Sequence, residues 1–287
     1  MDNTSKPLVA KTVTRITELR KTYTSTVGFI PTMGFLHAGH ASLIKRAKRE
    51  NDVVIVSIFV NPTQFGPKED FQQYPRDTKR DMQLLRSLHV DCIFFPTTRD
   101  MYPPEFFTFV EVSHISNVLE GKSRPGHFKG VATVVNKLFN ILQPTRAYFG
   151  QKDAQQVAII KKMVTDLNIP VEIVVGDTVR EINGLAMSSR NVFLNKKERT
   201  EAVVLYKSLL IAQKLFQLGE KSSKKIKHAM KNLICGTSGK IDYISIAKPQ
   251  TLQEISQIED VALISLAVRF GNIRLIDNIV IKMKYKR

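Results

Sequence analysis

The sequence contains little cysteine and no long apolar run. Its 287 residues include two cysteines, Cys92 and Cys235, which lie far apart and form no CxxC pair. A disulfide framework or a cysteine-based zinc site is therefore not expected. No apolar run reaches the roughly 18 residues that a membrane-spanning helix needs, and residues 1–16 have no apolar signal core. We therefore expect a cytoplasmic protein that does not enter a membrane.

Acidic residues and the common glycine-rich phosphate motifs are also scarce. Lys and Arg number 43 against 26 Asp and Glu, so the formal net charge is +17. A charge of this sign favours anionic partners such as nucleotides, phosphates or nucleic acid, without choosing among them. The sequence has neither GxxxxGK(S/T) nor GxGxxG, so a bound nucleotide would need a different phosphate-binding segment.

Short apolar runs alternate with helical patterns in the first part of the chain. Strands are predicted over 27–32, 52–60, 91–96, 146–150 and 171–175, and helices over 40–51, 77–90, 130–142 and 154–168. Run 52–60 is nearly all apolar, as in a strand that is covered on both faces. This alternation implies parallel βαβ units and an α/β fold.

The pattern changes after residue 194. A long helix is predicted from 196 to a C-cap at Gly219, followed by a second, basic helix at 221–232. Strands are predicted over 241–247, 261–270 and 273–281, which suggests a smaller α+β domain. We place the boundary near residue 185, giving a catalytic domain over 1–185 and a second domain over 186–287.

The segment "PTMGFLHAGH" at 31–40 is the strongest candidate for chemistry. His37 and His40 follow a predicted strand and stand at the start of a predicted helix. A helix N-terminus offers free backbone N–H groups and a positive dipole end, so an anion such as phosphate is the natural occupant. Zinc is an alternative, although no nearby Cys, Asp or Glu offers an obvious third ligand. Two histidines satisfied near a turn are the other alternative.

Five motifs in order carry a family resemblance. They are HAGH (37–40), NPTQF (61–65), RPGHF (124–128), YFGQKDAQQ (148–156) and GLAMSSRN (184–191). HAGH resembles the HxGH signature of the nucleotidyltransferase superfamily, and the five together resemble the pantothenate synthetases, or pantoate–β-alanine ligases. RLIDN (274–278) extends the resemblance weakly towards the C-terminus.

The resemblance implies a Rossmann-like N-terminal domain with a parallel sheet, and a smaller C-terminal domain that closes over the site. It implies that ATP and (R)-pantoate form pantoyl adenylate and pyrophosphate, after which β-alanine displaces AMP to give pantothenate. It also implies Mg²⁺ with the ATP and a homodimer. We expect these small molecules as partners, with no membrane and no nucleic acid.

Individual residues take roles only through this resemblance. It makes His40 the proton donor, with His37 and Lys152 as further catalytic residues, and it assigns pantoate and β-alanine to Gln64 and Gln156. The implied ATP-binding residues are Met33, Gly34, Phe35, Leu36, His37, Ala38, Gly39, His40, Gly150, Gln151, Lys152, Asp153, Val179, Met187, Ser188, Ser189 and Arg190. Gln151 stands where the family usually has Glu, and its contact is left open.

Several of these residues could also have a purely structural role. Gln64 could be a turn residue, Gln156 a surface glutamine, and Asp153 a helix N-cap beside an exposed Lys152. Arg124 and His127 could line the site or simply order their loop. The metal ligands are unknown. The carboxylate of Asp81 is one candidate, although triphosphate and water largely hold the metal in such sites.

Two other functions remain open from the residues alone. Another adenylyl- or cytidylyltransferase would share the HxGH chemistry, but NPTQF and RPGHF argue against it. A basic RNA-binding protein would suit the charge of +17. It would also be expected to alternate aromatic and basic residues for base stacking, and this pattern is not found.

Overall fold

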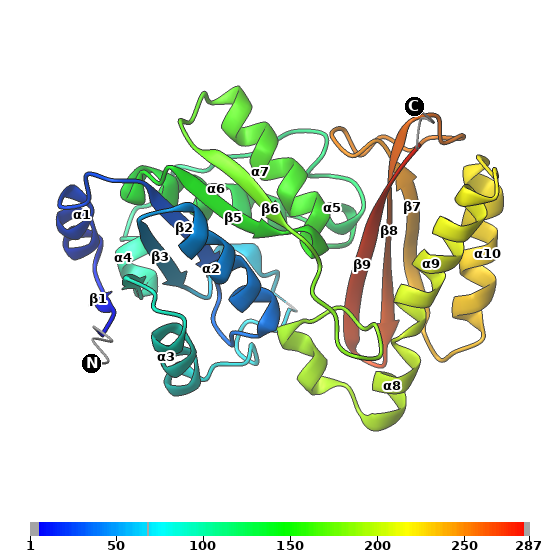
Figure 1. Cartoon of the computed structure of the whole chain (residues 1–287), viewed down its shortest axis with the longest axis horizontal. Coiled ribbons are helices and arrows are strands. Elements are labelled where there is room, and N and C mark those ends of the chain that lie inside the picture. The colour runs from blue at the N-terminus through cyan, green and yellow to red at the C-terminus, as the bar shows by residue number, and fades with distance from the viewer. Residues whose placement is uncertain (1–5, 68, 284–287) are drawn as a thin grey trace.

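Two β-sheets lie along the long axis of the molecule, as Figure 1 shows for this computed structural model. The structure describes residues 6–67 and 69–283. The first sheet has six parallel strands in the order β1-β4-β3-β2-β5-β6. Their bounds are β1 Leu8–Ala10, β2 Val27–Thr32, β3 Val53–Ile58, β4 Cys92–Phe94, β5 Arg146–Gly150 and β6 Glu172–Gly176. The predicted α/β fold is confirmed, and β1 is a strand that the prediction missed.

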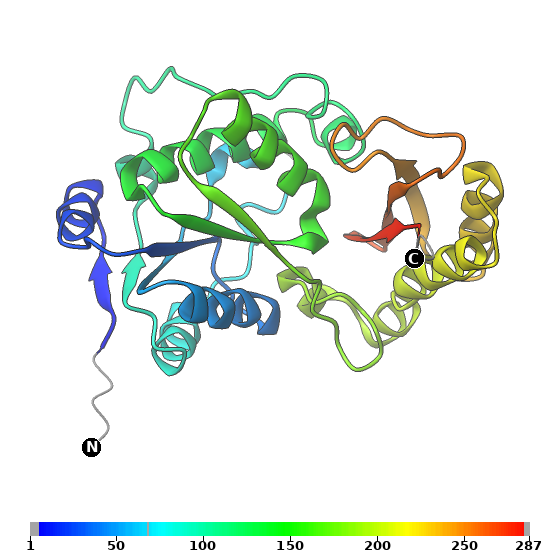
Figure 2. The same ribbon diagram turned by 45° about the horizontal axis from the view of Figure 1, so that its top comes forward.

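Helices cover both faces of this sheet (Figure 2). One face carries α1 Val13–Lys21, α6 His127–Leu142 and α7 Ala154–Asp166, and the other carries α2 Ala38–Glu50 and α3 Thr78–Ser87. The connection from β4 to α6 holds the short helices α4 Thr98–Met101 and α5 Glu120–Ser123, and 3-10 turns occur at η1 Pro62–Gln64, η2 Gln151–Asp153 and η3 Ser189–Phe193. Because both faces are covered, the central strands are apolar along their length.

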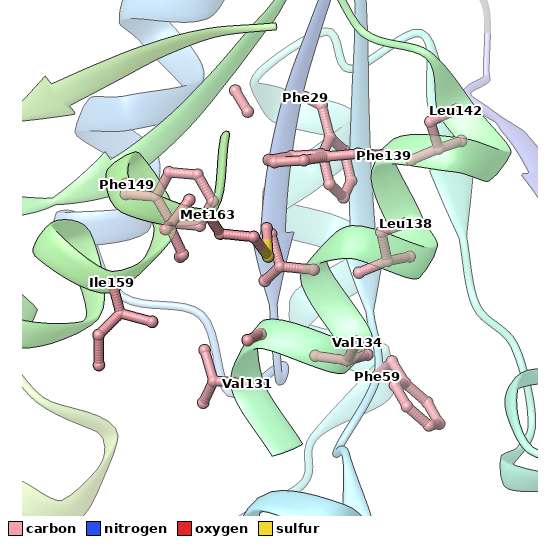
Figure 3. Packing of buried hydrophobic residues seen from close by; sticks show 14 of the residues in the cluster. Phe29, Phe59, Val131, Val134, Leu138, Phe139, Leu142, Phe149, Ile159 and Met163 are labelled. Atoms are coloured by element: carbon pink, nitrogen blue, oxygen red, sulfur yellow. The ribbon is translucent and has the colours of Figure 1, made fainter. Parts of the chain in front are cut away.

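Helix α6 forms the centre of the largest apolar cluster. Its side chains Val131, Val134, Leu138 and Phe139 pack towards the sheet, as Figure 3 shows. Phe139 meets Phe29 of β2 edge to face, with ring centroids 6.5 Å apart. It makes the same kind of contact with Phe149 of β5. Such pairs are favourable beyond the area that they bury. The cluster therefore fixes β2 and β5, the two strands that lead into the candidate site.

The order in which strands are added to the sheet reverses between β2 and β5. After β2 the sheet grows through β3 and β4, and it then resumes on the opposite side of β2 with β5 and β6. In open α/β sheets, ligands bind at the carboxyl ends of the strands beside such a switch point. The topology therefore points to the segments that follow Thr32, Gly150 and Gly176.

The C-terminal part consists of an antiparallel sheet with two helices on its outer face. The sheet contains β7 Lys240–Ala247, β8 Val261–Phe270 and β9 Ile273–Lys282 in that order, and the helices are α9 Val204–Gln217 and α10 Ser223–Cys235. Its apolar core collects residues from Leu185 to Ile281. Within the described residues, no helix is long and apolar enough to cross a membrane.

The helix predicted over 196–219 is interrupted. It consists of α8 Lys196–Glu201 and α9, which are separated by a turn at Ala202 and Val203. Both turn residues keep helical φ with ψ near −20°, the value of a tighter 3-10 turn. The predicted C-cap is confirmed, because Gly219 has φ +95° directly after the last helical turn.

Candidate active site

A cavity of about 240 Å³ lies at the carboxyl ends of β2, β5 and β6. It continues into a larger cleft of about 1130 Å³ that β9 of the C-terminal sheet also lines. The cavity brings together many residues that the sequence singled out: Met33, His37, Gly39, His40, Gln64, Gly150, Lys152, Asp153, Gln156, Val179, Met187, Ser188, Ser189 and Arg190. Four segments that are distant in the sequence therefore meet at the topological switch point of the sheet.

His37 and His40 form a capping box at the N-terminus of α2. Nδ1 of His37 accepts from the Gly39 N–H at 3.1 Å, and Nδ1 of His40 accepts from the His37 N–H at 3.3 Å. Because each Nδ1 accepts, the proton of each neutral ring lies on Nε2. A Cβ on Gly39 would lie 2.9 Å from the His37 ring, so glycine allows this close approach. Two Nε2–H donors are thereby fixed at the mouth of the helix.

Both imidazoles are neutral near pH 7. Burial and, to a smaller extent, the positive charge of Lys152 together lower the pKa of His37 to about 4. Burial also lowers the pKa of His40 to about 3, with additional repulsion from His37 and Lys152. Neutral imidazoles that have their Nδ1 atoms already bonded can act on a ligand as Nε2–H donors.

The turn before His37 is held by a buried carboxylate from α3. Asp81 is 2% exposed, and its two oxygens accept from the N–H groups of Phe35 and Leu36 at 2.8 and 2.7 Å. These bonds hold Phe35 at φ +50°, a left-handed conformation that is unfavourable for a phenylalanine. The geometry gives Asp81 a positioning role on this turn.

Gln64 lies on η1, which packs closely against α6. Its amide nitrogen lies 3.2 Å from the Met33 sulfur, and its amide oxygen accepts from Asn61 at 3.1 Å. Asn61, which is 1% exposed, also donates to the carbonyl of Gly130. A Cβ on Gly130 would lie 2.3 Å from the Thr63 carbonyl oxygen, so only glycine lets α6 approach this turn. The 8% exposed Gln64 is therefore a fixed cavity residue.

Lys152 and Asp153 stand at the end of β5, on the 3-10 turn η2. Their charged groups lie 3.5 Å apart, with the lysine side chain mostly covered and Asp153 about half exposed. Gln151, on the same turn, directs its amide away from the cavity and donates to Asn278 of β9 at 2.9 Å. The side chain of Gln151 is thus committed to the C-terminal sheet.

Two arginines at the cleft pair with acidic residues of the loop after η1. Arg190 makes two bonds to the carboxylate of Asp70 at 2.8 and 2.9 Å, and Arg124 makes two bonds to Glu69. Burial opposes the charge of Arg190, but the bonds to Asp70 raise its pKa above the ordinary value. His127 contacts the Gln64 carbonyl at 2.8 Å through Nδ1, and its pKa falls to about 4 because of burial and the nearby Arg124.

Some predicted ATP-binding residues do not line the cavity: Gly34, Phe35, Leu36, Ala38 and Gln151. Leu36 is fully buried in the apolar core, so only its backbone could reach a ligand. Sequence reasoning also missed cavity residues, among them Asn61, Tyr74, Asp177 and Thr178. Asp177 and Thr178 directly follow β6, which the sequence predicted at 171–175, and the strand-end rule applied to that strand would have identified them.

The cavity offers few ligands for a resident metal. Across residues 6–67 and 69–283, no group of three His, Cys, Asp or Glu side chains is arranged to hold a metal ion. The zinc alternative therefore lacks a third ligand in the part of the chain that is described. The carboxylates of Asp153 and Asp177 do line the cavity, and oxygen atoms of this type suit Mg²⁺ when it arrives with a triphosphate.

Comparisons with known proteins agree on one family. The family described as Pantoate-beta-alanine ligase matches residues 8–280. A pantothenate synthetase of Thermotoga neapolitana is 55% identical over 257 residues, covering 89% of this chain and 92% of that protein. The crystal structure of pantothenate synthetase from Thermus thermophilus has a TM-score of 0.91 and 45% identity, covering 95% and 98% of the two chains. That of a Francisella tularensis pantoate–β-alanine ligase, complexed with beta-gamma ATP and β-alanine, has a TM-score of 0.79 and 39% identity, covering 96% and 97%.

Proposed function

The chain belongs to the pantoate–β-alanine ligase family, whose reaction joins pantoate to β-alanine with ATP, and we propose that its cavity does so through pantoyl adenylate. The resemblance drawn from the five sequence motifs is thereby confirmed. A carboxylate is a poor acyl donor, whereas an acyl adenylate has a phosphate leaving group. Adenylation of pantoate therefore precedes attack by the amine of β-alanine.

One observation carries this proposal: donors from three segments converge on a single cavity. The Nε2–H groups of His37 and His40, the ammonium group of Lys152 and the segment 188–190 all face it. In the first step a pantoate oxygen bonds to the α-phosphorus while the bond from that phosphorus to the pyrophosphate oxygen breaks. Preorganised donors stabilise the negative charge that grows on the phosphate oxygens.

The histidines donate hydrogen bonds to these oxygens as neutral rings. A triphosphate beside His40 would raise the pKa of that imidazole from about 3, because a nearby negative charge favours the protonated form. The family resemblance assigns the proton donor to His40, and the His37 N–H holds the His40 ring by donating to its Nδ1. Lys152 adds a full positive charge, and Ser188, Ser189 and Arg190 supply hydroxyl and guanidinium donors.

Gln64 and Gln156 hold pantoate in line with the α-phosphorus. Both side chains line the cavity, and a neutral amide can both donate to a carboxylate and accept from a hydroxyl. Fixed placement of the attacking oxygen contributes much of the acceleration in such reactions. In the second step the β-alanine nitrogen bonds to the pantoyl carbonyl carbon, and AMP departs with the electrons of the acyl–oxygen bond.

We further propose that ATP enters as its Mg²⁺ complex, that the protein is a cytoplasmic homodimer, and that nucleic acid is not a partner. Exposed apolar side chains between α4 and α5 support self-association, because Phe107 is 83% exposed and Phe109 46% exposed. Light scattering on the purified protein tests the homodimer.

Pyrophosphate exchange tests the chemistry. Labelled pyrophosphate should enter ATP when pantoate and Mg²⁺ are present and β-alanine is absent, and it should not do so without pantoate. The complete mixture should then yield AMP and pantothenate. Formation of ADP and phosphate would instead indicate an acyl phosphate, and would refute the roles given to the histidines.

A further inference from the structure

Strand β9 carries two consecutive buried polar residues where the C-terminal sheet meets the nucleotide cleft. Asp277 is 2% exposed and Asn278 is 4% exposed, although the neighbouring strand positions are largely apolar. Buried polar groups are costly unless they find partners. The partners of these two side chains lie on the turn that carries Lys152 and on the ribbon that leads to residues 188–190.

Asn278 holds the turn that carries Lys152. Its amide nitrogen donates to the backbone carbonyls of Gln151 and Lys152 at 3.0 and 2.8 Å. Its amide oxygen accepts from the side chain of Gln151 at 2.9 Å. Three hydrogen bonds thus join one side chain to η2, across 126 or 127 residues of sequence. The backbone direction of Lys152 depends on the C-terminal sheet.

Asp277 holds the segment that contains Arg180. Its carboxylate accepts two bonds from Arg180, at 2.6 and 3.0 Å, and a third from the Asn278 N–H at 2.8 Å. The Arg180 guanidinium carbon lies 3.8 Å from the centre of the Tyr206 ring, and this stacking fixes the plane of the guanidinium group.

Arg180 lies on a narrow ribbon that leads into the second phosphate segment. Arg180 pairs with Ala186 across the ribbon, and the Met187 N–H donates to the Val179 carbonyl at 2.9 Å. The ribbon therefore joins Val179 to the phosphate segment 188–190. A carboxylate at position 277 fixes the whole ribbon through one arginine.

We propose that Asp277 and Asn278 are positioning residues for adenylation, which set the distance between the Lys152 turn and the ribbon that leads to residues 188–190. The inference rests on the proposed function. Because the two side chains are adjacent in one strand, their separation is fixed by the backbone, and so is that of the segments they hold. Neither residue contacts the reacting atoms in this role.

The role predicts a selective defect. Loss of the Asn278 donors would let the Lys152 turn shift, and a displacement near 1 Å can cost about 10²-fold in rate. The effect falls on adenylation, where the triphosphate must be held from both sides. The attack of β-alanine occurs after pyrophosphate has left, so it should be far less sensitive.

The test compares Asn278→Asp with Ile281→Ala at temperatures well below either melting point. Asn278→Asp keeps the size of the side chain but replaces both donors with an oxygen facing two carbonyls. Ile281 is 4% exposed in the core of the same sheet, three residues beyond Asn278 on β9, so its truncation controls for lost stability. Pyrophosphate exchange measures adenylation, and synthetic pantoyl adenylate with β-alanine measures the second step.

We expect Asn278→Asp to lower exchange by about 10- to 100-fold and to raise the KM for ATP, with the second step within twofold of the unaltered protein. Equal losses in both steps, or a loss of exchange no greater than in Ile281→Ala, would overturn the inference. If Asn278→Asp does not fold, Arg180→Lys tests the role of Asp277. Lysine keeps the positive charge but cannot make the paired hydrogen bonds that the guanidinium group makes to this carboxylate. A normal KM for ATP in that variant would refute the role of Asp277. Failure of the unaltered protein to make pantothenate would refute the proposed function instead.

Discussion

Replacement of His40 by glutamine separates its proposed chemical role from its structural one. His40 is the third residue of α2, and its Nδ1 accepts the N–H of the N-cap residue His37. Glutamine is a natural residue at this position of a capping box, because its amide oxygen reaches the same N–H. His40→Gln should therefore keep the helix start while losing the Nε2–H donor that faces the cavity.

His40→Gln and His40→Ala should lose the same activity but differ in stability. Loss of one preorganised donor typically costs 10²- to 10³-fold in turnover, or about 2.7–4 kcal/mol of transition-state stabilisation. His40→Ala should lose the same activity and, in addition, the hydrogen bond from the His37 N–H, which contributes about 1 kcal/mol to stability. For a chain of this size, that difference lowers the melting temperature by about 2–4 °C.

The assay is pyrophosphate exchange at saturating ATP, with a thermal melt of each variant. His228→Gln, at an exposed position of α10, serves as the matched control and should leave both measurements unchanged. If His40→Gln retained exchange within threefold of the unaltered protein, His40 could not be the donor that stabilises adenylation. If it melted as low as His40→Ala, the reasoning about the cap would be wrong.

Three further predictions concern charge, titration and packing. Lys152→Ala should slow adenylation by about 10²-fold or more yet leave the reaction of synthetic adenylate nearly normal, and equal slowing of both would contradict a phosphate role. The pKa of His37 is about 4 when folded and ~6.5 when unfolded, so the unfolded chain binds more protons between these values and stability falls as pH drops from 6.5 to 4. Urea unfolding should show a shallower fall in His37→Asn, which keeps an N-cap oxygen. Gly130→Ala places a Cβ 2.3 Å from the Thr63 carbonyl; it should cost about 1–3 kcal/mol and raise the KM for pantoate, and an unchanged KM would separate Gly130 from the Gln64 turn.

Most elements of the α/β fold could be predicted because their signals are local. The apolar run at 52–60 predicted β3, and the spacing of Leu43, Ile44 and Ala47 predicted the buried face of α2. Strand β1 has three residues, of which only Ala10 is buried, so its periodicity was too short to detect. The interruption at Ala202 and Val203 was missed because neither alanine nor valine is a helix-breaking residue.

The candidate site was predictable in its residue types and not in its geometry. HAGH after a strand indicated a phosphate site, and five motifs in order indicated the family. The tautomers of His37 and His40 depend on backbone N–H groups that only the folded helix start presents. The low pKa values depend on burial, which no single motif encodes.

The sequence by itself determined the alternation of strands and helices and the position of α2, because these depend on residues that are close together in the chain. The reaction class followed from five short motifs in order. Only the tertiary structure decided what Asp81, Gln151 and Asn278 do. Asp81 bonds to a turn 45 and 46 residues away, and Asn278 bonds to a turn more than 120 residues away. The partners of Asp81, and two of the three partners of Asn278, are backbone groups. Every residue carries such groups, so the sequence does not indicate which of them a side chain will contact. Packing of α3 against the first sheet selects the Asp81 contacts, and packing of the two sheets against each other selects those of Asn278.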